Sequence, residues 1–281
     1  MENFIEGVLT VWYILTVGSL LFLLWDLFTN TPTTKLMKLA WILVILYTGP
    51  IGLLIYLLSC RQPMPGMHDA FINVHWKQAV GSLLHCVAGD ATGIIFSAVV
   101  VYHFGLPNGL DLSIEYLCAF IVGLFIFQAL FMLSMYDGNY WMAVRKTFFA
   151  ETVSMNMVML GMIPTMVILM HTLPGANNPN HLLFWGVMSL ATIAGMITAY
   201  PINSWLVAKG LKHGMMSAIA KPKSTETMDM KMDMSSSMEK KEHHGAHLSA
   251  SKSILILVGT FLILFLSLWI TNWFVPIKFA L

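Results

Sequence analysis

Apolar runs of about 20 residues recur along the whole chain, and this repetition constrains the fold more than any motif. The first run, 8–27, has no charged residue before Asp26, so a helix formed by it is long enough to span a bilayer. The predicted fold class is therefore all-α: a polytopic helical membrane protein with about seven transmembrane helices. The predicted spans are 8–27, 39–59, 78–104, 112–136, 151–173, 182–207 and 254–275.

The composition agrees with this fold class. Hydrophobic residues make up 57% of the chain, charged residues only 10%, and the mean hydropathy is +0.74, values that exclude an ordinary soluble domain. The net charge of +1 gives no electrostatic reason to expect nucleic acid as a partner. The lipid bilayer is the predicted partner, and a homo-oligomer or a partner membrane protein remains an open alternative.

The spans divide the chain into three predicted parts: a six-helix membrane core (1–215), a flexible Met/His-rich linker (216–251) and a seventh transmembrane helix (252–281). Seven spans place the two ends on opposite sides of the membrane. The loops that hold most of the lysines and arginines then favour a cytoplasmic N-terminus and an external C-terminus in a bacterial inner membrane. Within the second span, Gly49 and Pro50 predict a kink, because proline removes a backbone donor.

The segment 84–94 places three reactive side chains, His85, Cys86 and Asp90, inside the third span. An ionisable residue near the membrane centre costs at least ~2.5 kcal/mol on insertion scales, so it commonly has a function. Cys86 and Asp90 are four residues apart and share one helix face, whereas His85 points elsewhere. We predict a midplane metal site here, although packing and ordinary hydrogen bonding could also explain each residue.

A second helix must complete such a site. Gly89 and Gly93 form a Gly-x-x-x-Gly pattern, which predicts close contact with a neighbouring helix. The span 151–173 is the leading candidate, because methionines recur on one of its faces, although such a face more often serves packing. The predicted thioether ligands are Met155, Met159 and Met162. Glu115 and Glu151 lie near predicted membrane boundaries, where solvation explains them as well as function.

The linker has the strongest compositional signal for metal binding, because it concentrates soft ligands on a flexible tether. Its predicted ligands are Met228, Met230, Met232, Met234, His243, His244 and His247. An ordinary polar linker is the alternative. A cytoplasmic location fits methionine poorly, because cysteine can do the same work in a reducing compartment.

Several stretches are similar to a known sequence family. Tyr47-Thr-Gly-Pro50, Leu58-Ser-Cys-Arg61, His85-Cys-Val-Ala-Gly-Asp-Ala-Thr-Gly93, Trp185-Gly-Val-Met-Ser-Leu-Ala-Thr192 and Gly210-Leu-Lys-His-Gly-Met215 resemble a bacterial integral-membrane family of unknown function. The resemblance covers about 12–215 and leaves out the linker and the last span. It implies a helical membrane fold and supplies no activity.

The predicted function is a membrane transporter of a soft transition-metal ion, with copper first, and a transporter is favoured over an enzyme. Thiols and thioethers favour Cu(I), and no phosphate-binding loop or hydrolase motif occurs in the sequence. A haem-binding redox protein is the first alternative, with axial ligands drawn from His85, His103, His171 and His181. A membrane scaffold that senses metal through its linker is the second.

Overall fold

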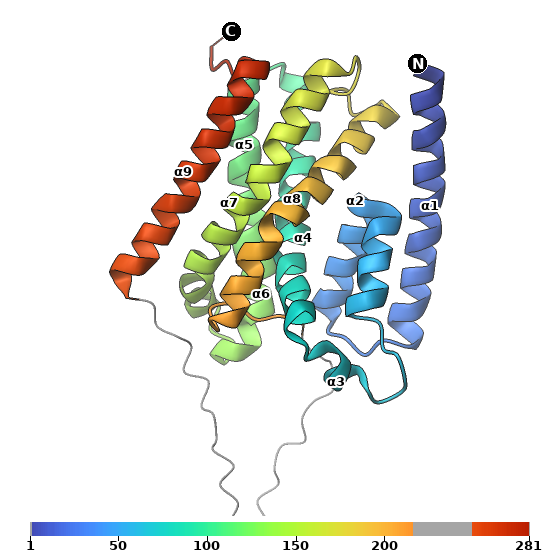
Figure 1. The fold of residues 1–281 in the computed structure, drawn as a ribbon, viewed down its shortest axis with the longest axis vertical. Helices are drawn as coiled ribbons and strands as arrows, with labels where there is room; N and C mark the ends of the chain where they lie inside the picture. The colour runs from blue at the N-terminus through green and yellow to red at the C-terminus, as the bar shows by residue number, and fades with distance from the viewer. Residues whose placement is uncertain (1, 216–248, 281) are drawn as a thin grey trace, which may run out of the picture.

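The computed structural model describes residues 2–215 and 249–280. Within these residues, seven helical segments are long and apolar enough to cross a membrane, so the predicted all-α polytopic membrane fold is confirmed (Figure 1). The elements are α1 (Glu2–Thr29), α2 (Lys35–Ser59), α3 (His68–Ile72), α4 (His75–Val101), η1 (Tyr102–Phe104), α5 (Asn108–Ile121), η2 (Val122–Gln128), α6 (Ala129–Met132), η3 (Leu133–Tyr136), α7 (Tyr140–Thr172), α8 (Leu182–Ala208) and α9 (Ala250–Phe274).

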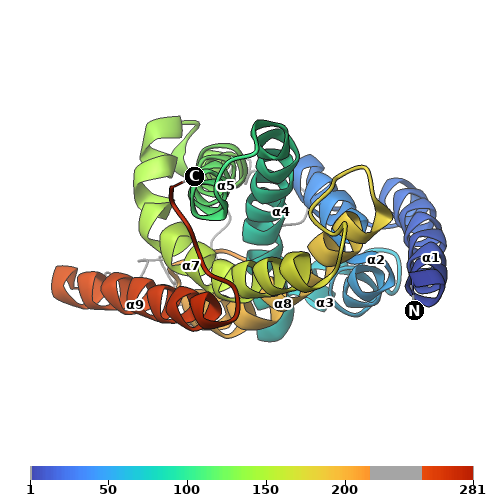
Figure 2. The same ribbon diagram turned by 90° about the horizontal axis from the view of Figure 1, so that it is seen from above.

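Helix α4 forms the centre of the bundle. In its most apolar stretch 78% of the residues are buried, against 17% in the corresponding stretches of α1 and α9. Seen from above, α1 and α9 lie at opposite edges, while α4, α5, α7 and α8 lie between them (Figure 2). The side chains of α1 and α9 therefore supply much of the lipid-facing surface, and polar groups on α4 are enclosed by protein.

Helix α2 does not cross the bundle but folds back on itself (Figure 1). Gly49 interrupts its helical backbone with a φ of 57°, and Pro50 follows directly. A straight helix of this length would separate its ends by ~36 Å. Instead, the Gln62 N–H just after α2 donates a hydrogen bond of 3.4 Å to the Thr31 hydroxyl just before it. The tip reaches the middle of α1, because a Cβ on Gly49 would lie 2.5 Å from Thr16 Oγ1.

A buried carboxylate on α1 joins the two ends of this re-entrant hairpin. Asp26 is fully buried and accepts hydrogen bonds from the hydroxyls of Thr31 at 2.9 Å and Tyr56 at 2.5 Å. It also forms an ion pair of 3.0 Å with Arg61. The rings of Trp41 and Tyr56, one in each half of α2, pack edge to face with centroids 5.1 Å apart. The predicted kink is therefore a complete reversal, stabilised by contacts between residues far apart in sequence.

Both described ends of the chain lie at the same end of the bundle (Figure 1). Tyr13, near the start of α1, donates a hydrogen bond to the Leu182 carbonyl at the start of α8. The Gly109 N–H at the start of α5 donates one to the Lys278 carbonyl beyond α9. We call this the terminal end, and the opposite end, where α8 finishes and α9 begins, the linker end. This differs from the predicted placement of the two ends on opposite sides, because α2 returns to the side from which it starts.

Two further features differ from the sequence-based boundaries. Helix α7 begins at Tyr140, where the Asn139 side chain caps it, so it starts eleven residues before the predicted span 151–173. Glu151 consequently lies well inside α7 and is fully buried. Glu115 is also buried, with 7% exposure. Neither carboxylate is a solvated boundary residue.

Close contact between α4 and α5 follows the predicted glycine pattern. A Cβ on Gly89 would lie 2.7 Å from the Gly123 Cα, and one on Gly93 would lie 2.6 Å from the Ala119 Cα. The two backbones thus approach each other through small residues, as a Gly-x-x-x-Gly pattern predicts. This contact positions the candidate site, because Asp90 lies between the two glycines in sequence.

Candidate functional site

Three side chains with metal-ligating atoms meet in the middle of the bundle. Cys86 and Asp90 on α4 join Glu151 on α7, and one potential ligand atom from each lies within 4.8 Å of the others. All three residues are buried, with no exposure for Cys86, Asp90 and Glu151. The structure thus brings together two predicted site residues and adds a carboxylate from α7, the helix expected to complete the site.

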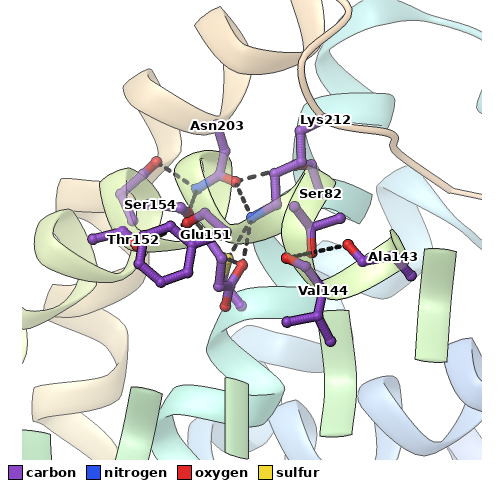
Figure 3. Close-up of polar contacts among 12 residues, drawn as sticks. Ser82, Ala143, Val144, Glu151, Thr152, Ser154, Asn203 and Lys212 are labelled. Carbon is purple, nitrogen blue, oxygen red and sulfur yellow. Dashed lines mark hydrogen bonds and ion pairs between the residues drawn. The ribbon is translucent and has the colours of Figure 1, made fainter. Parts of the chain in front are cut away.

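On the linker side of the cluster, the Cys86 thiol, Glu151 Oε2 and the Lys212 ammonium are all hydrogen-bonded. The Cys86 thiol donates to Glu151 Oε2 at 2.9 Å and lies 3.1 Å from the Ser154 hydroxyl. Lys212, from the segment after α8, contacts Cys86 Sγ and forms an ion pair of 3.3 Å with Glu151 Oε2. Figure 3 shows Lys212 and Glu151 pointing toward each other, with Asn203 of α8 beside them.

Asn203 fixes the position of this lysine. Its side-chain oxygen accepts hydrogen bonds from Lys212 at 3.2 Å and from Ser82 at 3.1 Å, while its amide nitrogen donates to Ser154 at 2.7 Å. The contacts that Lys212 makes with Cys86, Asn203 and Glu151 are those expected of a positively charged ammonium.

On the opposite side of the cluster, carboxylate oxygens lack donors. Among the described residues, neither oxygen of Asp90 has a hydrogen-bond partner, and Glu151 Oε1 has none either. These atoms face the backbone of Gly123, where a Cβ would lie 2.4 Å from Asp90 Oδ1 and 3.0 Å from Glu151 Oε1. Gly123 belongs to η2, a π-helical stretch of seven residues, and such bulges are frequent at functional sites.

The donor set fits a bound cation. A buried carboxylate oxygen without a donor is unfavourable unless a proton or a metal ion neutralises it. One thiol and two carboxylates at this separation can converge on a single transition-metal ion after small rotamer adjustments, because metal–ligand bonds are about 2.0–2.3 Å long. Because Gly123 has no side chain, its backbone packs directly against these oxygens.

The predicted histidine ligand lies apart from the cluster. The ring of His85 is stacked on Phe131, with centroids 3.6 Å apart, and neither of its nitrogens has a partner among the described residues. His103 lies in η1, which directly continues α4, eighteen residues beyond His85. This spacing separates the two histidines by ~27 Å along the helix axis, so His85 and His103 cannot ligate one haem iron. His103, His171 and His181 are exposed at the terminal end.

The predicted methionine ligands form part of the core. Met155, Met159 and Met162 are completely buried on α7. Met155 lies one turn from Glu151, whereas Met162 lies three turns away and packs against α8, where a Cβ on Gly195 would be 2.7 Å from its Cγ. The linker candidates Met228, Met230, Met232, Met234, His243, His244 and His247 lie outside the described residues.

Two residues of the cluster were not predicted as site residues from the sequence. The sequence places Glu151 at a membrane boundary, because the predicted span 151–173 begins at this residue, whereas α7 begins at Tyr140. Lys212 was counted only as a positive loop charge, although it occurs in the Gly210-Leu-Lys-His-Gly-Met215 stretch that carries part of the family resemblance. Glycines explain how this segment reaches the core, since a Cβ on Gly214 would lie 2.4 Å from the Gln78 carbonyl oxygen.

A comparison with known families bears on this same region. Residues 75–212 match a family described as Domain of unknown function (DUF4396). The match begins at the first residue of α4 and ends at Lys212, so it contains the whole cluster. It is shorter than the predicted resemblance, which began near residue 12. No curated protein and no solved structure matches the chain.

Proposed function

We propose that this chain is a membrane transporter that carries a thiophilic transition-metal ion through the cluster of Cys86, Asp90 and Glu151, with copper as the first candidate. The observation that supports this proposal is the pair of buried carboxylates with unpartnered oxygens beside a buried thiol. A structural ion pair would need its lone pairs satisfied within the protein. Here the satisfied atoms face Lys212, and the unsatisfied atoms face the backbone of Gly123.

The charge of the cluster depends on the Cys86 proton. The carboxylates of Asp90 and Glu151 and the ammonium of Lys212 leave one net negative charge when Cys86 is a thiol, and two when it is a thiolate, the form that ligates metal. A Cu(I) ion that displaces this proton leaves one negative charge, which Asp90 neutralises by taking up a proton, whereas Zn(II) balances both charges. Sulfur makes copper the first candidate. Met155, one turn from Glu151, could add a thioether after a change of rotamer.

The architecture around the cluster also supports transport. The tip of the α2 hairpin lies deep in the bundle, where the hydroxyl of Tyr47 is 2.8 Å from that of Thr92 on α4, two residues after Asp90. Interrupted helices that end near the midplane are common beside the ion sites of transporters. Helix α2 therefore links the lipid-facing helix α1 to the helix that holds the cation.

We further propose that the linker end faces the cytoplasm and that both termini lie outside. Most of the described lysines and arginines lie toward the linker end: Lys35, Lys38, Arg61, Lys77, Arg145, Lys146, Lys209, Lys212 and Lys252. Among the described residues, only Lys278 lies at the terminal end. The Met/His-rich linker would then capture or deliver metal on the cytoplasmic side.

Copper(I) binding to the purified full chain tests the central site. Competition with a chromophoric copper(I) chelator gives the number of bound ions and their affinity. We expect Asp90→Asn and Cys86→Ser each to remove one copper equivalent or to weaken its binding at least tenfold, ~1.4 kcal/mol. Copper uptake into proteoliposomes should fall in parallel.

Asp137→Asn is the matched control, because Asp137 is an exposed turn residue with a φ of 50°, a conformation that asparagine also tolerates. This variant should bind and transport copper as the wild type does. Unchanged copper stoichiometry and unchanged uptake in Asp90→Asn would exclude the central cluster as the transport site.

A further inference from the structure

A second pair of carboxylates lies on α5, between the central cluster and the terminal end. Asp111 and Glu115 are four residues apart, so they project from the same helix face. Glu115 is 7% exposed, and its Oε2 atom has no hydrogen-bond partner among the described residues. Asp111 Oδ1 is likewise buried without a described partner. Buried carboxylate oxygens in this state favour a proton or a cation nearby.

The contact between α5 and α4 connects Glu115 to the central cluster. Steps of four residues lead from Glu115 through Ala119 to Gly123 of η2, which touches the central carboxylates. Helix α4 runs antiparallel to α5, and Gly89 faces Gly123 while Gly93 faces Ala119. Continuing this pairing by four more residues on each helix places the buried Ser97 of α4 opposite Glu115 of α5.

The carboxylate pair also lies close to the terminal surface. A cavity of about 550 Å³ opens at the start of α5, lined in part by Asn108, His171 and Lys278. Asp111 and Glu115 do not line this cavity, but Asp111 lies one turn from Asn108 along α5 and Glu115 two turns, so Asp111 is the nearer of the two carboxylates to it. The small residues Ala119 and Gly123 follow along the same seam.

We propose that Asp111 and Glu115 form a second cation-binding station, which exchanges the ion between the terminal-side cavity and the central cluster. This proposal rests on the proposed function. All the donors of the station are oxygen atoms, so it accepts cations without selecting for sulfur affinity. Selection among metal ions then depends on the Cys86 sulfur in the central cluster. The carboxylate station binds the ion weakly, so the ion can leave it for the central cluster.

Binding of Mn²⁺ alone tests the station without assuming that copper is the cargo, because Mn²⁺ prefers carboxylate ligands. The probe is the electron paramagnetic resonance signal of free Mn²⁺, titrated with the full chain in the Asp90→Asn background, which impairs the central cluster. We expect Glu115→Gln to weaken the binding of one Mn²⁺ equivalent about tenfold, whereas Glu115→Asp, which keeps the charge, retains it. Asp137→Asn should have no effect.

Copper uptake then separates the two proposals. With copper supplied at the terminal side, Glu115→Gln should raise the KM several-fold and leave equilibrium copper binding at the central cluster intact. Unchanged Mn²⁺ binding together with an unchanged KM in a folded Glu115→Gln protein would overturn the station, even if Asp90→Asn abolishes copper binding. If instead Asp90→Asn leaves copper binding and uptake unchanged while Glu115→Gln loses Mn²⁺, the transport proposal fails and the station stands as a cation site.

Discussion

Gly123 is the residue whose substitution tests the geometry of the central cluster most directly. In Gly123→Ala the new methyl carbon would lie 2.4 Å from Asp90 Oδ1 and 3.0 Å from Glu151 Oε1, so at least one carboxylate must move. Overpacking of this kind costs ~1–3 kcal/mol. We expect copper(I) affinity to fall roughly ten- to hundredfold, measured by chelator competition.

Gly259→Ala provides the control for this change. Gly259 lies on the lipid-facing helix α9, and a Cβ there meets no atom within 4 Å. Alanine is the better helix former by ~1 kcal/mol, so this variant should fold and bind copper as the wild type does. Wild-type copper affinity in Gly123→Ala would show that the ion does not use the space beside Gly123.

At the scale of single residues, helical spacing predicted part of the cluster and could not predict the rest. The four-residue step from Cys86 to Asp90 is a local property of α4, so the sequence places both on one face. Glu151 and Lys212 are 61 residues apart and reach the same point only through the packing of α7 and the segment after α8. The hydrophobic periodicity of a single helix therefore cannot predict the contact between Glu151 and Lys212.

Helix α2 permits a distance test at the scale of one element. Spin labels attached to Lys35→Cys and Pro63→Cys, both at exposed positions, flank the hairpin. A spanning helix would separate them by ~40 Å, whereas the re-entrant hairpin keeps both at the linker end. We expect double electron–electron resonance to give a distance well below ~40 Å, while a distance near that length would mean that α2 crosses the membrane.

The sequence indicated a break in α2 but not its size. Gly49 and Pro50 are local signals, and they fix only the position at which the helix stops. The reversal depends on Asp26, which binds Tyr56 in the second half of α2, Arg61 after the helix and Thr31 before it. Such long-range hydrogen bonds determine whether a kinked helix continues or returns, and apolar length alone cannot distinguish these outcomes.

Charges are distributed unevenly along the whole molecule. Asp111, Glu115, Asp90 and Glu151 follow one another from the terminal end toward the middle, and Lys212 closes the series from the linker end. In the proposed transport path, a cation approaching from the terminal side would be attracted by each carboxylate in turn until it met the ammonium. Further movement toward the linker end would require Lys212 to change its contacts, so the proposal makes the segment 209–215 the barrier between the two sides.

The reversal of α2 makes a prediction about the whole molecule that the count of apolar segments does not make. Six crossings by α1, α4, α5–α6, α7, α8 and α9 return the chain to the side from which it starts, whereas seven crossings would separate its ends. Reporter enzymes that are active only outside the cytoplasm should therefore give the same strong signal at either terminus and none when inserted between α8 and α9. Opposite signals from the two terminal fusions would contradict the re-entrant hairpin, and strong signal from the insertion alone would reverse the proposed orientation while keeping the hairpin.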